Sequence, residues 1–341
     1  MTDLLSLPTK LTLTTDRLPT IDLSRNEKPD AVPASLHREL EQAIGRIGRY
    51  PLKLEKEVIE LIADSHGVEP DNVMLVHGID EALDALIAHF PALSWKTFQP
   101  TFDGYDIRFR IHRRDYQAID LGPTYDVENV GLQHVTPRDF VVLANPNNPT
   151  GCQVDYSILS KLIDNSAQLL IDEAYIHYSG QPSAVSTLSN QAFVFYSLSK
   201  AFGLAGQRLG FLFGPTPDIT LMRQRQWFCN IDFLSLMAIR HILLEKLHDH
   251  HAQQLIQRRD LLAAAISILG YDVIPTETNF LLIRTRHASL LTEFMKENRI
   301  LIFNAAQFGL PLHVRISVGT HEDNERLLAC LESFLAVKDN L

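Results

Sequence analysis

The stretch YSLSKAFGLAGQRLGF (residues 196–211) follows the apolar run AFVFYS and places Lys200 after two serines, ahead of a glycine-spaced segment that contains Arg208. Similar short runs, rich in β-branched and aromatic residues, recur along the chain and alternate with amphipathic helical patterns. This alternation predicts an α/β fold with a mainly parallel sheet and crossover helices on both faces. The predicted strands span residues 72–77, 140–145, 168–172, 192–197 and 210–214.

The pattern changes after residue 230, where two helical stretches over 232–268 precede the strand-like runs NFLLIRT and HVRISVG. A last helix is predicted to begin at Thr320, with Asp323 completing a capping box, and Asp155 is the expected cap of an earlier helix. The polar, proline-interrupted N-terminus is predicted to be an arm over the surface or over a partner subunit. The predicted parts are an arm over 1–35, a large domain over 36–230 and a smaller α+β domain over 231–341.

Charge and composition limit the possible partners. The 341 residues include 41 acidic and 31 basic side chains, a formal net charge of -10, with no run of like charges. Nucleic acid and anionic membranes are therefore unexpected partners. Three scattered cysteines favour a reducing compartment, no apolar stretch reaches the length of a membrane span, and the 14 histidines show no paired metal spacing. We expect a cytoplasmic protein that binds no metal.

Polar side chains cluster just after the predicted strands. In an open parallel sheet, ligands bind at the carboxyl ends of the strands, so these positions are candidates for a site. The turn at His77 and Gly78 opens a helix and offers free backbone N–H groups to an anion. The other strand ends are followed by the rigid turn NPNNPTG (145–151), by Asp172 with Tyr175, and by Ser197, Ser199 and Lys200.

These segments, in this order, resemble one known family. The motifs LSRNEKP, RYP, NPNNPTG, DEAY, SLSKAFGLAGQRLG and VRISVGT span most of the chain. Together they resemble the fold-type I aminotransferases that use pyridoxal 5'-phosphate, in the histidinol-phosphate aminotransferase branch. The resemblance implies an enzyme that moves an amino group between an amino acid or amine and a 2-oxo acid.

The resemblance assigns catalytic roles that the chemistry also favours. Lys200 would form the Schiff base with the cofactor, which requires a partly desolvated amine near other cations. Asp172 would keep the pyridine nitrogen protonated, and this requires an ionised carboxylate. Asn148 and Tyr175 would donate to the phenolic oxygen of the cofactor. Taken singly, each of these residues is more often a surface, capping or core residue.

The cofactor phosphate and ring have further implied partners. By resemblance, the phosphate is held by Ser197, Ser199, Arg208 and the backbone turn of Gly78, Ile79 and Asp80, as expected for hydroxyls, a cation and a helix start. Phe102 stands where the family usually stacks a tyrosine on the ring. Tyr50 of the RYP motif would reach the phosphate of a neighbouring subunit, which implies a homodimer with shared sites.

The substrate side shows a departure from the family. Arg315 matches the arginine that clamps the substrate carboxylate, and Asn26 belongs to the same predicted substrate site. Relatives usually carry a phosphate-binding arginine where this chain has Phe303. We therefore hypothesise a pocket that favours an apolar or aromatic side chain over histidinol phosphate. The alternative is that the missing charge comes from another position, namely Arg284, Arg286, Arg299 or Lys28.

Parts of the sequence also match other functions. Ser197-Leu-Ser-Lys200 fits the S-x-x-K pattern of penicillin-binding acyltransferases, but these also need S-D-N and K-T-G motifs, and the chain has only KTF at 96–98. A non-catalytic cofactor-binding protein would not need Lys200 and Asp172. A threonine-phosphate decarboxylase and an aromatic amino-acid aminotransferase are the nearer alternatives within the same fold.

Overall fold

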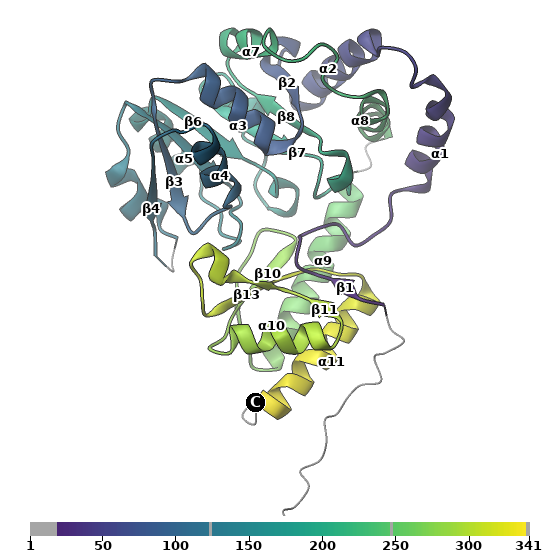
Figure 1. Ribbon diagram of the computed structural model, residues 1–341, viewed down its shortest axis with the longest axis vertical. Coiled ribbons are helices and arrows are strands. Elements are labelled where there is room, and N and C mark those ends of the chain that lie inside the picture. Colours follow the sequence, from purple (N-terminus) through teal and green to yellow (C-terminus); the bar gives the residue numbers. More distant parts are fainter. Residues whose placement is uncertain (1–18, 123–124, 246–247, 339–341) are drawn as a thin grey trace, which may run out of the picture.

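The computed structural model describes residues 19–122, 125–245 and 248–338, and these form two lobes, each built around its own sheet (Figure 1). The large lobe contains a seven-stranded sheet in the order β2-β8-β7-β6-β5-β3-β4. All neighbouring strands pair in parallel except at β8, which is antiparallel to both of its neighbours. The strands are β2 (Val73–Val76), β3 (Ser94–Gln99), β4 (Tyr116–Asp120), β5 (Asp139–Ala144), β6 (Gln168–Asp172), β7 (Phe193–Ser197) and β8 (Gly210–Phe213).

The mainly parallel sheet confirms the predicted fold class. The sequence analysis missed β3 and β4, because SWKTFQ and YQAID mix polar residues into the strands and lack an extended apolar run. Burial of Lys96 in β3 is compensated by Asp139 of β5, whose carboxylate lies 3.0 Å from the Lys96 ammonium. The ion pair therefore joins β3 to its inner neighbour β5.

Alternate residues of the strands pack on opposite faces of this sheet, as the two-residue period requires. In β5, Val141 and Leu143 join one buried cluster, while Phe140 and Val142 join another. The first cluster contains residues of α2 (Leu52–His66), α5 (Tyr156–Asn165), α6 (Val185–Leu188), α8 (Phe233–Glu245) and α9 (His248–Ile268). The second contains residues of α3 (Gly78–His89), α4 (Gly104–Ile111) and α7 (Thr216–Arg223).

The small lobe contains a four-stranded antiparallel sheet in the order β12-β13-β10-β9. Helix α11 begins after Thr320, whose hydroxyl accepts the N–H of Asp323 while the Asp323 carboxylate accepts the N–H of Thr320. This reciprocal pair is the predicted capping box. The elements are β9 (Asp272–Ile274), β10 (Phe280–Arg284), α10 (Ala288–Glu297), β11 (Ile300–Leu301), β12 (Phe303–Asn304), β13 (His313–Ser317) and α11 (His321–Val337).

The described part of the N-terminal arm, from residue 19, does more than cover a surface. Its strand β1 (Ile21–Asp22) pairs in parallel with β11, so it joins the small lobe (Figure 1). Residues 1–18 of the predicted arm lie outside the described residues. The domain limits at 36 and 231 stay predictions, although α8 follows the second limit and packs against α1 (Ala34–Ala43) and α2 of the large lobe.

The second predicted cap is confirmed in position only. Asp155 is the N-cap residue of α5, but its side chain makes no capping hydrogen bond to the helix. Its carboxylate accepts a hydrogen bond from Gln181 Nε2 at 3.0 Å instead. A partner distant in sequence therefore replaces the local one.

Candidate active site

A cavity of about 630 Å³ lies between the two lobes, at the carboxyl ends of β5, β6 and β7. The large lobe, the small lobe and the arm all contribute to its lining. It brings together most of the predicted site residues: Asn26, Gly78, Ile79, Phe102, Asn148, Asp172, Tyr175, Ser197, Ser199, Lys200, Arg208, Phe303 and Arg315.

Two predicted residues do not line this cavity. Asp80 lies in the first turn of α3 and lines a neighbouring cavity of about 540 Å³, and its carboxylate is 3.7 Å from Arg208. Tyr50 is 76% exposed on the outer surface, edge-on to Phe228. Within the single chain, Tyr50 therefore has no contact with the cavity.

Lys200 follows β7 and directs its amine into the cavity, where Nζ donates to the backbone carbonyl of Arg25 at 3.1 Å. Burial of the amine lowers the pKa of Lys200 to about 8, and the charges of Arg315 and Arg208 act in the same direction. The carboxylates of Glu27 and Asp172 oppose this shift. The amine therefore loses its proton at a lower pH than an ordinary lysine, which favours its use as a nucleophile or base.

Asp172 ends β6 and is buried. Its Oδ2 accepts a hydrogen bond from the Tyr105 hydroxyl at 2.6 Å, and its Oδ1 accepts one from the Ala174 backbone N–H at 3.0 Å. Burial raises the pKa of Asp172 to about 6, while these two donors and the Lys200 ammonium favour the ionised form. Asp172 is thus a carboxylate whose charge depends on its hydrogen-bond partners.

A hydrogen-bonded network joins the arm, the large lobe and β13. Arg315 donates through Nη1 to Asn148 Oδ1 at 2.5 Å and through Nη2 to the Ser24 carbonyl at 2.6 Å. Because Arg is only a donor, this bond identifies the Asn148 oxygen and leaves its amide N–H groups for other partners. Asn26 donates to the Tyr175 hydroxyl at 3.0 Å.

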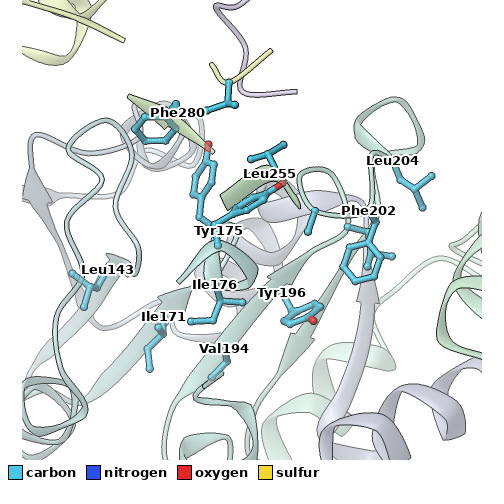
Figure 2. Close-up of a cluster of buried hydrophobic side chains, with 14 of the residues drawn as sticks. Leu143, Ile171, Tyr175, Ile176, Val194, Tyr196, Phe202, Leu204, Leu255 and Phe280 are labelled. Atoms are coloured by element: carbon cyan, nitrogen blue, oxygen red, sulfur yellow. The ribbon is translucent and has the colours of Figure 1, made fainter. Parts of the chain in front are cut away.

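Asn26 is itself held by the small lobe. It adopts a left-handed backbone with φ of 55°, which asparagine tolerates better than most residues. Its Oδ1 accepts from the Ser317 hydroxyl at 3.1 Å, and its backbone carbonyl accepts from Asn279 at 3.0 Å. Tyr175 also packs edge-on against Phe280 of β10, toward which it extends in Figure 2. The arm therefore ties the two walls of the cavity together.

The opposite end of the cavity is suited to an anion. Ser197, Ser199 and Arg208 all line the cavity. The Arg208 guanidinium lies 3.7 Å from the carboxylate of Asp80, in the first turn of α3. A Cβ added at Gly78 would lie 3.1 Å from Arg208 Nη2, so the absence of a side chain there lets the cation reach the helix start. Free N–H groups at a helix start, hydroxyls and a guanidinium are the usual ligands of a phosphate.

The small-lobe side of the cavity is aromatic. The Arg315 guanidinium carbon lies 4.5 Å from the ring centroid of Phe303, and 5.4 and 5.8 Å from those of Phe280 and Phe308. Phe303 and Phe308 also contact each other, with centroids 5.1 Å apart. Burial lowers the pKa of Arg315, yet stacking on ring faces favours its charge.

The sequence analysis missed several lining residues. Tyr105 stands three residues after Phe102, within the same turn, and that spacing was the available signal. Phe308 and Gln307 belong to a short 3-10 helix, and nothing in the local pattern marks them as site residues. Among the others, the polar and charged residues contributed by the arm and the large lobe are Ser24, Arg25, Glu27 and Asp103.

A lysine with a depressed pKa, a buried carboxylate and an anion cradle occupy one cavity at the strand ends of an α/β sheet. Those groups fit the amine-reactive carbonyl, the ring nitrogen and the phosphate of pyridoxal phosphate. The fold and the site thus define a pyridoxal-phosphate-dependent enzyme. The chain belongs to the aminotransferase class I and II family, whose model matches residues 19–331.

Relatives within this family share nearly the whole chain. Histidinol-phosphate aminotransferase 1 of Burkholderia pseudomallei (strain K96243) is 29% identical over 342 residues, which cover 93% of this chain and 92% of the relative. The histidinol-phosphate aminotransferase of Aquifex aeolicus (strain VF5) is 27% identical, covering 92% of each chain. The chain is thus similar to histidinol-phosphate aminotransferases throughout its length.

A solved structure agrees. A candidate aminotransferase from Burkholderia pseudomallei K96243 is 38% identical, with a TM-score of 0.87, covering 93% of this chain and 98% of the other. The protein is therefore an aminotransferase that uses pyridoxal phosphate and resembles the histidinol-phosphate branch, as the sequence analysis predicted.

The described residues contain no helix long and apolar enough to cross a membrane. Within the same residues, no group of three or more His, Cys, Asp or Glu side chains could hold a metal ion.

Proposed function

We propose that this aminotransferase transfers the amino group of an α-amino acid with an aromatic or apolar side chain to a 2-oxo acid. The observation that carries the proposal is the stack of Phe303 on Arg315, which puts a ring where relatives usually have a second cation. Arg315 is the proposed clamp for the substrate carboxylate, with Asn26 supporting the same end of the cavity. The donor side chain would then lie against the Phe303 and Phe308 rings.

The proposed cofactor contacts follow the chemistry of the cavity. Asp172 would hold the proton on the ring nitrogen, Asn148 and Tyr175 would donate to the phenolic oxygen, and Phe102 would cover the ring face. Both Phe102 and Asp172 line the cavity, which supports this arrangement. The proposed phosphate ligands are Ser197, Ser199, Arg208 and the backbone of Gly78 and Ile79, with Asp80 positioning Arg208 through its ion pair.

Lys200 is the proposed catalytic residue. When bound, pyridoxal phosphate supplies an electron-withdrawing ring that acidifies the Cα–H of the substrate. The neutral Lys200 amine would accept that proton, and the resulting ammonium would return it during the transfer. The lowered pKa of Lys200, about 8, supports a base that is regenerated near neutral pH.

The four cations that could replace the missing phosphate-binding arginine are not among the residues that line the cavity. Arg284 pairs with Asp272 at 3.5 Å, and Arg286 contacts His287. Lys28 packs beside Gly203, and Arg299 lies beside β1, whose Ile21 donates to its backbone carbonyl. Arg25 does line the rim, but its guanidinium is 3.4 Å from Asp22. These placements support the apolar interpretation of the substrate pocket.

The proposed active form is a homodimer. Large apolar side chains are exposed on the connection between α1 and α2 and on the segment before α8, including Tyr50 and the 85%-exposed Trp227. A monomer rarely exposes such a patch, so a partner surface is expected there. Trp227 of this exposed surface lines the smaller cavity together with Asp80, which pairs with Arg208. The exposed surface therefore lies near the anion end of the site, which supports the proposed contact between that end and Tyr50 of a second copy. The patch consists of Ile44, Ile47, Tyr50, Leu52, Trp227 and Phe228.

The proposed setting is the cytoplasm, with small molecules as substrates and neither nucleic acid nor membranes as partners. All three cysteines are free, which supports a reducing compartment. The net charge of -10 supports the exclusion of polyanions.

Steady-state kinetics with L-phenylalanine and with L-histidinol phosphate, each paired with 2-oxoglutarate, test the proposed substrate class. We expect the wild type to have the higher kcat/KM with phenylalanine, and Phe303→Arg to raise the value for histidinol phosphate about tenfold to a hundredfold through a charge-assisted contact. Leu312→Arg adds the same charge on the exposed surface of the small lobe and should leave both values unchanged.

Efficient use of histidinol phosphate by the wild type, with no gain from Phe303→Arg, would contradict the proposed substrate class. Release of carbon dioxide from phosphothreonine without transamination would instead support the decarboxylase alternative.

A further inference from the structure

Tyr105 contacts the carboxylate of Asp172 from a helix on the large lobe. It lies in the first turn of α4, its side chain is fully buried, and its hydroxyl donates to Asp172 Oδ2 at 2.6 Å. The second carboxylate oxygen accepts the Ala174 N–H. Both oxygens of Asp172 are therefore oriented by donors before any ligand binds, and each oxygen keeps a further lone pair.

The same tyrosine also contacts Phe102. Their rings meet edge to face, with centroids 5.5 Å apart and an interplanar angle of 86°. The approach depends on Gly104, because a Cβ there would lie 2.2 Å from the Phe102 ring. Tyr105 thus contacts both Asp172, the proposed partner of the cofactor nitrogen, and Phe102, the proposed partner of the cofactor ring face.

We infer that Tyr105 is a positioning residue for the cofactor, which orients the Asp172 carboxylate and keeps it ionised so that Asp172 retains the proton on the ring nitrogen. This inference rests on the proposed role of Asp172. A donor to a carboxylate favours its charged form, and an O–H···O⁻ bond of this length is charge-assisted. Tyr105 remains a donor because burial and the neighbouring carboxylate raise its own pKa well above the usual value.

Opposing effects set the pKa of Asp172, so the loss of one hydrogen-bond donor should change it. Burial raises its pKa to about 6, and the bonds from Tyr105 and Ala174 and the charge of Lys200 oppose that effect. Tyr175 also faces this site, and the adjacent Glu173 carboxyl has its pKa raised to about 7 by burial. Loss of the Tyr105 hydroxyl would therefore bring the protonation of Asp172 into the neutral pH range.

Tyr105→Phe removes only the hydroxyl. In the holoenzyme we expect the acid limb of the kcat/KM profile to move up by about one to two pH units, and kcat at pH 7 to fall about tenfold to a hundredfold, with KM little changed. The absorbance band of the bound cofactor should titrate over the same shifted range. Tyr125→Phe is the matched control, because this buried tyrosine donates to the Phe98 carbonyl and not to Asp172.

Asp172→Asn separates the inference from the proposed function on which it rests. Near-wild-type activity of Asp172→Asn would overturn the role of Asp172 itself. Loss of activity in Asp172→Asn together with an unshifted acid limb and absorbance band in Tyr105→Phe would overturn the inference alone.

The double variant tests for a merely structural role of Tyr105. If the hydroxyl acts through the carboxylate, adding Tyr105→Phe to Asp172→Asn should cause little further loss of kcat. An equal factor in both backgrounds would mean that the tyrosine only supports packing, and would contradict the inference. Because the comparison is a ratio, general destabilisation by the substitution cancels.

Discussion

The two walls of the cavity are built in different ways. The large-lobe wall includes Asp172 at the end of β6, Ser197, Ser199 and Lys200 at and after the end of β7, and Arg208 just before β8. The small-lobe wall includes Arg315, with the rings of Phe303 and Phe308 packed against its guanidinium. The first wall is rich in polar groups held by the sheet, and the second is mainly apolar around a single charge.

The difference suggests a division of tasks. Groups on the large-lobe wall would serve the cofactor and would therefore affect every substrate alike. Groups on the small-lobe wall would contact the substrate itself, its carboxylate at Arg315 and its side chain at Phe303 and Phe308, so their effects would depend on which of these groups a substrate carries. Substitutions on each wall can test this division directly.

The largest effect is expected on the large-lobe wall. Lys200→Ala should lower kcat about 10⁴-fold for every donor, because the wall loses its only proposed proton-transfer group. Borohydride reduction of the wild-type holoenzyme followed by peptide mapping should label Lys200. Lys161→Ala, which removes an exposed lysine paired with Glu128, is the control. A label on another lysine would refute the assignment.

A smaller and selective effect is expected from Arg315→Gln. The variant should lose about tenfold to a hundredfold in kcat/KM for phenylalanine, since a charge-assisted contact to the carboxylate disappears. Phenethylamine lacks that carboxylate, so its kcat/KM should stay near the wild-type value. Equal losses for both amines would break the proposed division, because Arg315 would then act on the cofactor side through Asn148.

The pH dependence of the Lys200 amine tests whether the large-lobe wall buries it. Burial disfavours the ammonium and lowers the pKa of Lys200, so the neutral amine should appear as pH rises through about 8 and not through 10.5, the usual value for lysine. Acetylation of the cofactor-free full-length chain, followed by mass spectrometry, should give a labelling midpoint near pH 8 for Lys200. Exposed Lys161 provides the reference within the same sample, and a shared midpoint would contradict the burial argument.

The smallest effect is expected from Phe308→Ala. One ring–guanidinium contact is worth about 0.5–1 kcal/mol, so KM for phenylalanine should rise about twofold to fivefold while kcat changes little. Leu312→Ala, an exposed position in the same lobe, should change neither constant. A large fall in kcat for Phe308→Ala would show that the small-lobe wall also governs the chemical step.

Much of the large-lobe wall was predictable from the sequence. Asp172, Ser197 and Lys200 follow apolar runs, and a parallel sheet brings such strand ends to one edge. The structure accordingly places them in one cavity. Strand β4 was not predictable in the same way, because its burial pattern follows from its edge position and not from an apolar run.

The sequence by itself determined the α/β class, the order of the motifs and the residues with reactive chemistry, because local periodicity and short spacings encode them. Only the tertiary structure decided which groups meet across the cavity. Ser24 meets Arg315 across 291 positions of the chain, and Tyr105 meets Asp172 across 67. Such contacts depend on how helices and strands pack around a shared core, and no local pattern specifies that packing.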